Sequence, residues 1–245
     1  MKHWLIHFLL IFLLTPHGLA QDIPSAEPNL TINASTEIPT TILQHTPASK
    51  KKLIMINPDG HAKYPGRKLA ENYERAETYK CAETLQRMLQ ERYSTRVVFT
   101  RVPGEEIVHL QNASFANRFN ADLFINLHLY KEDTEKPKVY LYYLVYNSIH
   151  DFAPPITKSL SFTPIHHAHI SSLGTTVTYA QAMAANLSTP SLQKQFDFAG
   201  PFGLPIKPLA GIANPALALE IGINSDQKWQ DLILPLVESL SFFFK

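Results

Sequence analysis

The sequence has little cysteine and no large excess of positive charge, which are marks of disulfide-rich proteins and of nucleic-acid-binding proteins. Its 245 residues include a single cysteine, Cys81, so no internal disulfide framework can hold the fold. Its 22 Lys and Arg are nearly balanced by 21 Asp and Glu, without the basic patch that nucleic-acid-binding domains carry. We therefore expect a core that is held together by packing alone, and no nucleic acid among the partners.

Long hydrophobic runs are also absent, except near the start of the chain. Residues 4–14 form an apolar run that one histidine interrupts, and a membrane helix needs about 20 residues. A short basic start precedes this run, and the small residues of Gly18–Ala20 follow it. This layout predicts a signal peptide over residues 1–20 and an exported protein, either periplasmic or secreted. An uncleaved anchor is the alternative, and the membrane is a partner only in that case.

The next segment, residues 21–50, lacks Gly, Phe, Trp and Tyr but holds eight Ser or Thr and four Pro. No helical or strand periodicity runs through it. Such a composition buries too little apolar surface to fold, so we predict a disordered linker over residues 21–50. One domain, residues 51–245, would follow.

Within this domain, apolar strands alternate with helical patterns. The pattern predicts strands at 52–57, 96–100, 121–127, 139–146 and 216–221, and helices at 71–92, 110–120, 179–187 and 229–243. Residues 197–215 are rich in Gly and Pro and are predicted to be a loop. Continuously apolar strands are typical of a parallel sheet that is covered on both faces. We therefore predict an α/β fold of three layers, in which helices cover both faces of a mostly parallel, twisted sheet.

Ligands of such sheets bind beyond the carboxyl ends of the strands, and polar residues are predicted there. His61 follows the first strand after a short loop, His128 ends "ADLFINLH", and Glu220 ends "PALALE". Glu74 comes near the start of the first long helix. It precedes Cys81 by seven residues on the same helical face, so its carboxylate can point inward.

Two histidines and two glutamates suit a hydrolytic zinc site. Catalytic zinc takes three protein ligands and keeps one position for water, whose pKa then falls to about 7. His61, Glu74 and His128 are the predicted ligands, and Glu220 is the predicted base that passes the proton to the leaving nitrogen. Each histidine could instead be solvated, and Glu74 could serve only the helix dipole. Glu220 is harder to dismiss, because it follows four apolar residues and an isolated buried carboxylate is costly.

Five motifs in order also resemble one family. They are "INPDGHA" around His61, "ERAETYKCAETLQRML" from Glu74, "VVFTR" ending at Arg101, "FANRFNADLFINLH" ending at His128, and "PALALEIGI" around Glu220. Together they resemble the zinc-dependent N-acetylmuramoyl-L-alanine amidases of the amidase_3 type. The resemblance implies zinc on the same three ligands and Glu220 as catalytic acid/base. It also implies peptidoglycan as substrate, cleaved between the lactyl group of muramic acid and L-alanine.

The chain departs from the family pattern at Asn112, where the family usually has an arginine, and in two longer segments. Its first loop has an extra residue before Gly60-His61 and lacks the Gly-Gly that follows in the family. Residues 129–215, where the family shapes its groove or holds an autoinhibitory helix, align poorly, so regulation by an activator stays open. Asp59 and Arg67 flank His61 and could orient it or contact substrate, or could face solvent. A catalytically inactive module that binds wall fragments or a protein partner is the alternative function, and a zinc peptidase with another amide substrate is a third.

Overall fold

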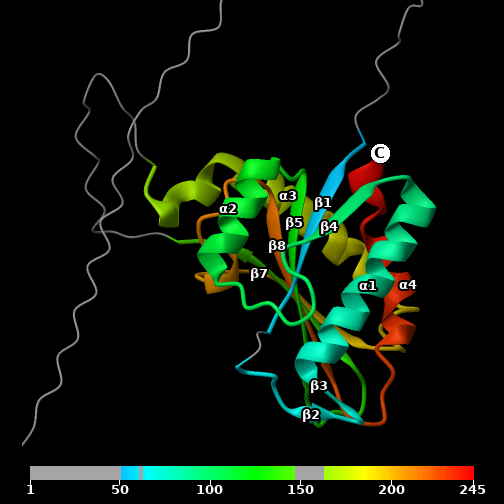
Figure 1. Cartoon of the computed structure of the whole chain (residues 1–245). Helices are drawn as coiled ribbons and strands as arrows, with labels where there is room; N and C mark the ends of the chain where they lie inside the picture. Colours follow the sequence, from blue (N-terminus) through cyan, green and yellow to red (C-terminus); the bar gives the residue numbers. More distant parts are fainter. Residues whose placement is uncertain (1–50, 61–62, 147–162) are drawn as a thin grey trace, which may run out of the picture. The chain divides into compact units, whose positions relative to one another are not determined.

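The computed structural model describes residues 51–60, 63–146 and 163–245 (Figure 1). The predicted signal peptide and linker, and the predicted zinc ligand His61, lie outside these described residues, so those predictions stay open. Among the helices that the structure describes, none is both long and apolar enough to span a bilayer.

The domain is organised around a six-stranded sheet. Its strands are β1 (Leu53–Pro58), β4 (Arg96–Phe99), β5 (Leu123–Lys131), β6 (Lys138–Leu144), β7 (Asp197–Leu204) and β8 (Ala216–Ile223). Their order across the sheet is β4-β1-β5-β8-β6-β7. Four strands run parallel, β6 runs antiparallel to β8, and β7 runs parallel to β6. A separate two-stranded ribbon, β2 (Lys68–Leu69) with β3 (Asn72–Tyr73), lies just before the first helix.

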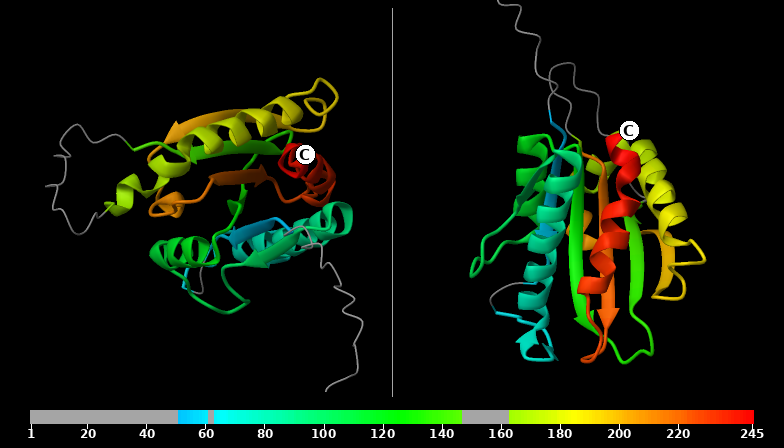
Figure 2. Two further views of the ribbon diagram at one scale, coloured as in Figure 1. Left: turned by 90° about the horizontal axis from the view of Figure 1, so that it is seen from above. Right: turned by 90° about the vertical axis from the view of Figure 1, so that its right-hand side faces the viewer.

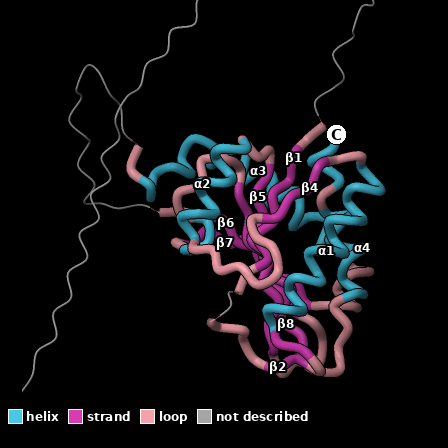
Figure 3. Tube along the Cα trace, in the orientation of Figure 1, coloured by secondary structure: helices cyan, strands magenta, loops and turns pink. Residues whose placement is uncertain are grey.

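Helices cover both faces of this sheet (Figures 2 and 3). The first face carries α1 (Glu74–Tyr93), α3 (Leu173–Leu187) and α4 (Gln230–Ser239), and the second carries α2 (His109–Phe119) and the short 3-10 helix η2 (Lys207–Leu209). Two further 3-10 helices, η1 (Ile165–Ser172) and η3 (Ser241–Phe244), complete the described elements. The predicted fold class is confirmed.

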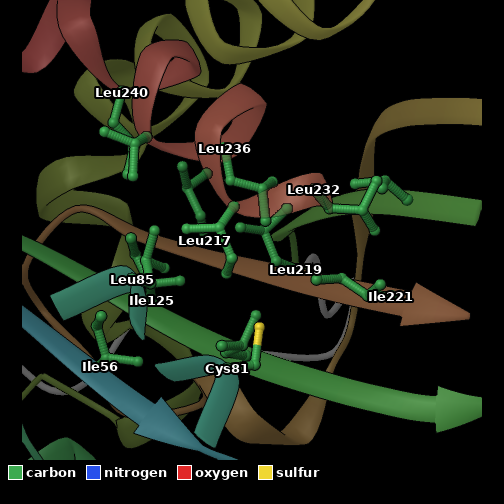
Figure 4. Close-up of a cluster of buried hydrophobic side chains, with 14 of the residues drawn as sticks. Ile56, Cys81, Leu85, Ile125, Leu217, Leu219, Ile221, Leu232, Leu236 and Leu240 are labelled. Atoms are coloured by element: carbon green, nitrogen blue, oxygen red, sulfur yellow. The ribbon is translucent and has the colours of Figure 1, made fainter. Parts of the chain in front are cut away.

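The main core lies between the sheet and the helices of the first face. Figure 4 shows that it brings together Leu219 of β8, Ile125 of β5, Leu85 of α1 and Leu236 of α4, which are 0–1% exposed. Burial of each such side chain contributes about 1.5–3 kcal/mol. Because side chains alternate along a strand, the residues between them point to the second face, where Phe124 packs in a smaller cluster with α2.

One predicted loop is wrong, because residues 197–204 form β7. The Gly and Pro residues of this segment led to the loop prediction. Among the described strands, β7 is an edge strand whose one partner is β6, and the register of this pair shifts between Tyr140 and Tyr142 of β6. Proline has no backbone N–H to donate to a neighbouring strand. An edge strand tolerates Pro201 because it has a neighbouring strand on one side only.

Helix boundaries differ from the prediction by more than one residue in three places. α1 begins at Glu74 rather than at residue 71, because the preceding two residues pair in β3. α3 begins at Leu173, six residues before the predicted start. α4 ends at Ser239, and the residues after it turn into η3. Pro235 lies inside α4.

Candidate active site

His128 and Glu220 lie side by side in the middle of the sheet. They are direct register partners on the parallel strands β5 and β8. The prediction that each ends its strand is wrong, because the two strands stay paired for three further residues, to Lys131 and Ile223. Both side chains point to the second face, and both are half-buried. The structure therefore brings a histidine and a carboxylate together at the carboxyl-terminal half of that face.

The antiparallel strand β6 places tyrosines against Glu220. Tyr140 is its register partner, and the hydroxyl of Tyr142 donates a hydrogen bond to its carboxylate. Burial raises the pKa of Glu220 above the ordinary value of a glutamate. The charge of His128 and the Tyr142 hydrogen bond lower this pKa, and Asp59 raises it, but burial prevails. A carboxyl with a raised pKa takes up and releases a proton closer to neutral pH, as proton-transfer catalysis requires.

Two tyrosines of the same site, Tyr142 and Tyr130, have raised pKa values. Burial, followed by the charge of Glu220, raises the pKa of Tyr142 to about 12, so its phenol stays protonated and remains a donor. Tyr130 packs its ring 5.6 Å from the ring of His128, and its hydroxyl donates to Glu132 at 2.8 Å. Burial and that hydrogen bond also raise the pKa of Tyr130.

Glu74 begins α1 and is 8% exposed, as its predicted inward orientation requires. Its Oε1 accepts hydrogen bonds from the Lys131 backbone N–H at 2.6 Å and from Arg67 Nε at 3.0 Å, and its Oε2 accepts from the Arg67 backbone N–H at 2.9 Å. Arg67, predicted to flank His61, therefore contacts the neighbouring predicted ligand. A carboxylate has about four acceptor positions, so these three hydrogen bonds leave room for one further ligand.

The loop after β1 is anchored up to residue 60. The backbone N–H of Asp59 donates to the Leu127 carbonyl at 2.8 Å, and its side chain accepts from the Gly60 N–H at 2.6 Å. Arg101, which is 4% exposed, donates from Nε to the Pro58 carbonyl at 2.8 Å. The arginine of the "VVFTR" motif thus fixes the backbone that leads to residue 61.

The predicted zinc ligands suit the metal in kind, because imidazole nitrogen and carboxylate oxygen are its usual ligands. In the described ranges, no three His, Cys, Asp or Glu side chains lie close enough to hold a metal ion. The predicted set depends on His61, which lies outside those ranges. The zinc site therefore remains a prediction, of which the structure describes Glu74 and His128.

Sequence reasoning missed the tyrosines beside Glu220. The signal was present in "VYLYYL", where the alternation places Tyr140 and Tyr142 on one face and the buried Leu141 on the other. The sequence pattern predicts a strand at 139–146 but does not place this strand next to β8. Antiparallel pairing of β6 with β8 is a tertiary feature that local patterns do not encode.

Comparison with known proteins adds a family to this geometry. The family model for N-acetylmuramoyl-L-alanine amidase matches residues 54–232. The chain belongs to the N-acetylmuramoyl-L-alanine amidase family. The matched range runs from β1 into α4 of this amidase-family domain, so it includes Asp59, Glu74, His128 and Glu220. Membership supports hydrolysis of an amide bond in the bacterial cell wall.

Solved structures of amidases share the fold of this family member. The catalytic domain of the amidase CwlV from Bacillus (Paenibacillus) polymyxa var. colistinus is 15% identical, with a TM-score of 0.51 over 78% of this chain and 94% of its own. An amidase from Clostridium difficile 630 is 17% identical (TM-score 0.51, 80% and 97%). Ami1 from Mycobacterium smegmatis is 13% identical (TM-score 0.52, 79% and 96%). These likenesses establish the fold, and a search of curated proteins found no match.

Proposed function

We propose that this protein hydrolyses the amide bond between the lactyl group of N-acetylmuramic acid and L-alanine in peptidoglycan, as a zinc-dependent amidase. The observation that carries the proposal is the pairing of Glu220 with His128 across β5 and β8. A half-buried carboxyl with a raised pKa lies beside an imidazole, in a chain of the amidase family. We infer from the substrate that the protein acts outside the cytoplasm, in the periplasm or as a secreted protein.

Each residue of the site has a role in this reaction. His61, Glu74 and His128 would hold zinc, which when bound supplies a polarised substrate carbonyl and an acidified water. Glu220 accepts a proton from the attacking water and delivers it to the leaving nitrogen of L-alanine. Tyr142 fixes the orientation of that carboxylate through its hydrogen bond. Arg67 and the backbone of Lys131 hold the Glu74 carboxylate in place at the carboxyl end of β5.

The experiment is the digestion of purified peptidoglycan by the full chain with added zinc. Mass spectrometry of the products should find stem peptides with a free amino terminus on L-alanine, together with glycan strands whose lactyl groups end in a carboxylic acid. Glu220→Gln, purified and tested in parallel, should release neither. If the wild-type protein is folded and binds zinc but yields neither product, this substrate is excluded and another amide must be sought.

An inactive module that binds wall fragments or a protein partner is a second candidate. The hydrogen bonds that occupy the Glu74 carboxylate favour it, because three of about four acceptor positions are already taken. The two candidates differ in a sedimentation assay. An inactive module would pellet with insoluble peptidoglycan and leave it intact, whereas the amidase would release soluble peptide from the same material.

A further inference from the structure

We propose that Tyr140, Tyr142 and Phe202 form a saccharide subsite that receives the N-acetylmuramic acid ring of the substrate. These three side chains are called the aromatic row below. The inference rests on the proposed amidase function, since it assigns one side of the Glu220 site to the glycan part of peptidoglycan.

The aromatic row runs from Glu220 towards the edge of the sheet. Tyr140 is opposite Glu220 in the β6–β8 pair, and Tyr142 is opposite Phe202 in the β6–β7 pair. The ring centroids of Tyr140 and Tyr142 are 6.2 Å apart with planes inclined by 16°, and those of Tyr142 and Phe202 are 5.9 Å apart. Three rings on two neighbouring strands therefore form one continuous aromatic surface that begins at the predicted catalytic carboxylate.

This surface is open to a ligand. Phe202 is 43% exposed on the edge strand β7, and Tyr140 and Tyr142 are half-buried. On β8, the register partner of Tyr142 is Ala218, which adds only a methyl group beside the tyrosine. An exposed aromatic side chain that continues a row of two half-buried tyrosines, next to a polar centre, is typical of a binding site.

The chemistry of the substrate matches the position of the aromatic row. The scissile carbonyl belongs to the lactyl group, which is an ether substituent of the muramic acid ring. A sugar ring must therefore lie within a few bonds of the carbon that is attacked. Pyranose rings present C–H groups on their faces, and these pack on aromatic rings, while their hydroxyl and acetamido groups bind phenol hydroxyls.

The carboxyl-terminal side of Glu220 is less suited to a sugar. There Gly222 of β8 has Tyr130 and Lys138 as its register partners, and both side chains donate to Glu132, at 2.8 Å and 2.7 Å. These polar groups already bind one another, and the ring of Tyr130 packs near His128. The glycan is therefore assigned to the aromatic row, which extends from Tyr140 in the other direction, to Tyr142 of β6 and Phe202 of β7.

The test is a comparison of two substrates that differ only in the sugar. One is a disaccharide muropeptide, and the other is an N-lactyl peptide with the same amino acids and no sugar ring. We expect Phe202→Ala to raise KM for the muropeptide about 2- to 10-fold, the range of one aromatic packing contact, and to leave kcat unchanged. Both constants for the N-lactyl peptide should stay at the wild-type values, and Phe202→Trp should restore the muropeptide KM.

The matched control is Phe119→Ala. Phe119 is also an exposed phenylalanine, 57% accessible, but it ends α2. Its replacement should leave KM and kcat unchanged for both substrates. An unchanged muropeptide KM in Phe202→Ala, or an equal rise for both substrates, would overturn the subsite. If the wild type cleaves neither substrate, the amidase proposal fails separately. Fluorescence titration of Phe202→Trp with an N-acetylglucosamine tetramer then decides, because a saturable change absent from wild type supports the subsite and no change overturns it.

Discussion

The two faces of β5 and β8 are built for different purposes. On the first face, Leu127, Leu129 and Leu219 are completely buried against helices. On the second face, side-chain burial decreases along β5, from the completely buried Phe124 to the half-buried His128. Neighbouring residues of one strand therefore serve stability and chemistry in alternation. Substitutions at adjacent positions should affect one property without the other.

The largest effect is expected on the second face, at Glu220. Glu220→Gln keeps the size of the side chain but cannot accept the proton from water. We expect the rate of peptide release from peptidoglycan to fall about 100- to 10,000-fold, the usual contribution of general acid–base catalysis. The matched control is Glu238→Gln, at an exposed glutamate of α4 that pairs with Arg92, and its rate should equal that of wild type. Wild-type activity in Glu220→Gln would contradict the assigned role.

The next largest effect is a loss of stability at Leu219, which precedes Glu220 and points to the first face. Leu219→Ala removes a fully buried side chain from the main core, and should lower the free energy of unfolding by about 2–5 kcal/mol. Urea denaturation measures this change. Leu234→Ala, at a leucine of α4 that is 46% exposed, should change stability by about 0.5 kcal/mol or less. Glu220→Gln should be no less stable than wild type, because burial already disfavours its carboxylate. A large loss of stability in Glu220→Gln would break the division between the faces.

A smaller loss of stability, which depends on pH, is expected from substitution of Glu77 on the first face. Burial alone would raise the pKa of Glu77, but hydrogen bonds from Trp229, Lys80 and Asn72 together lower it below 4.5. Because the folded state has the lower pKa, this carboxylate stabilises the fold above the pKa of the unfolded chain, and the contribution is lost as the pH falls through the folded value. Glu77→Gln should therefore lose about 1–2 kcal/mol at pH 7.

Urea denaturation at several pH values measures the difference between wild type and Glu77→Gln. The difference should be constant from neutral pH down to about pH 5 and should shrink below about 4.5. A difference that does not vary with pH would show that Glu77 acts through packing rather than charge.

The smallest effect is expected at an exposed pair on the outer surface of α1. Arg87 and Glu91 lie 3.6 Å apart, and both are more than 60% exposed. Arg87→Ala should change the free energy of unfolding by less than about 0.5 kcal/mol. The same urea titration in 1 M salt should erase even this difference, because salt screens exposed charges. A loss above about 1 kcal/mol would mean that Arg87 has a contact beyond this pair.

The sequence predicted most of the first face, because its features are local. Apolar runs marked β1, β5 and β8, and helical spacing placed Glu74 and Cys81 on one inward face of α1, where both are buried. It also singled out His128 and Glu220, since a polar side chain stands out within or after an apolar run. It did not predict that they face each other inside paired strands, or that Tyr142 contacts Glu220, because strand order and register depend on residues far apart in the chain.

Edge strand β7 was missed for a related reason. Gly200, Pro201 and Gly203 are residues that usually interrupt strands, and only the edge position of β7 makes them acceptable. The interaction of Arg67 with Glu74 could not be predicted from the sequence either, although both residues were assigned to the same site. Its geometry depends on the turn that β2 and β3 make before α1.

The most direct test of a hydrolytic centre at this site is the zinc content of the purified, folded full chain. Wild type, His128→Ala and His109→Ala are dialysed against zinc and analysed by elemental mass spectrometry, with circular dichroism to verify folding. We expect about one zinc per chain in wild type and in His109→Ala, and a large loss of zinc in His128→Ala. Folded wild-type protein without zinc, or full zinc occupancy in His128→Ala, would contradict this expectation.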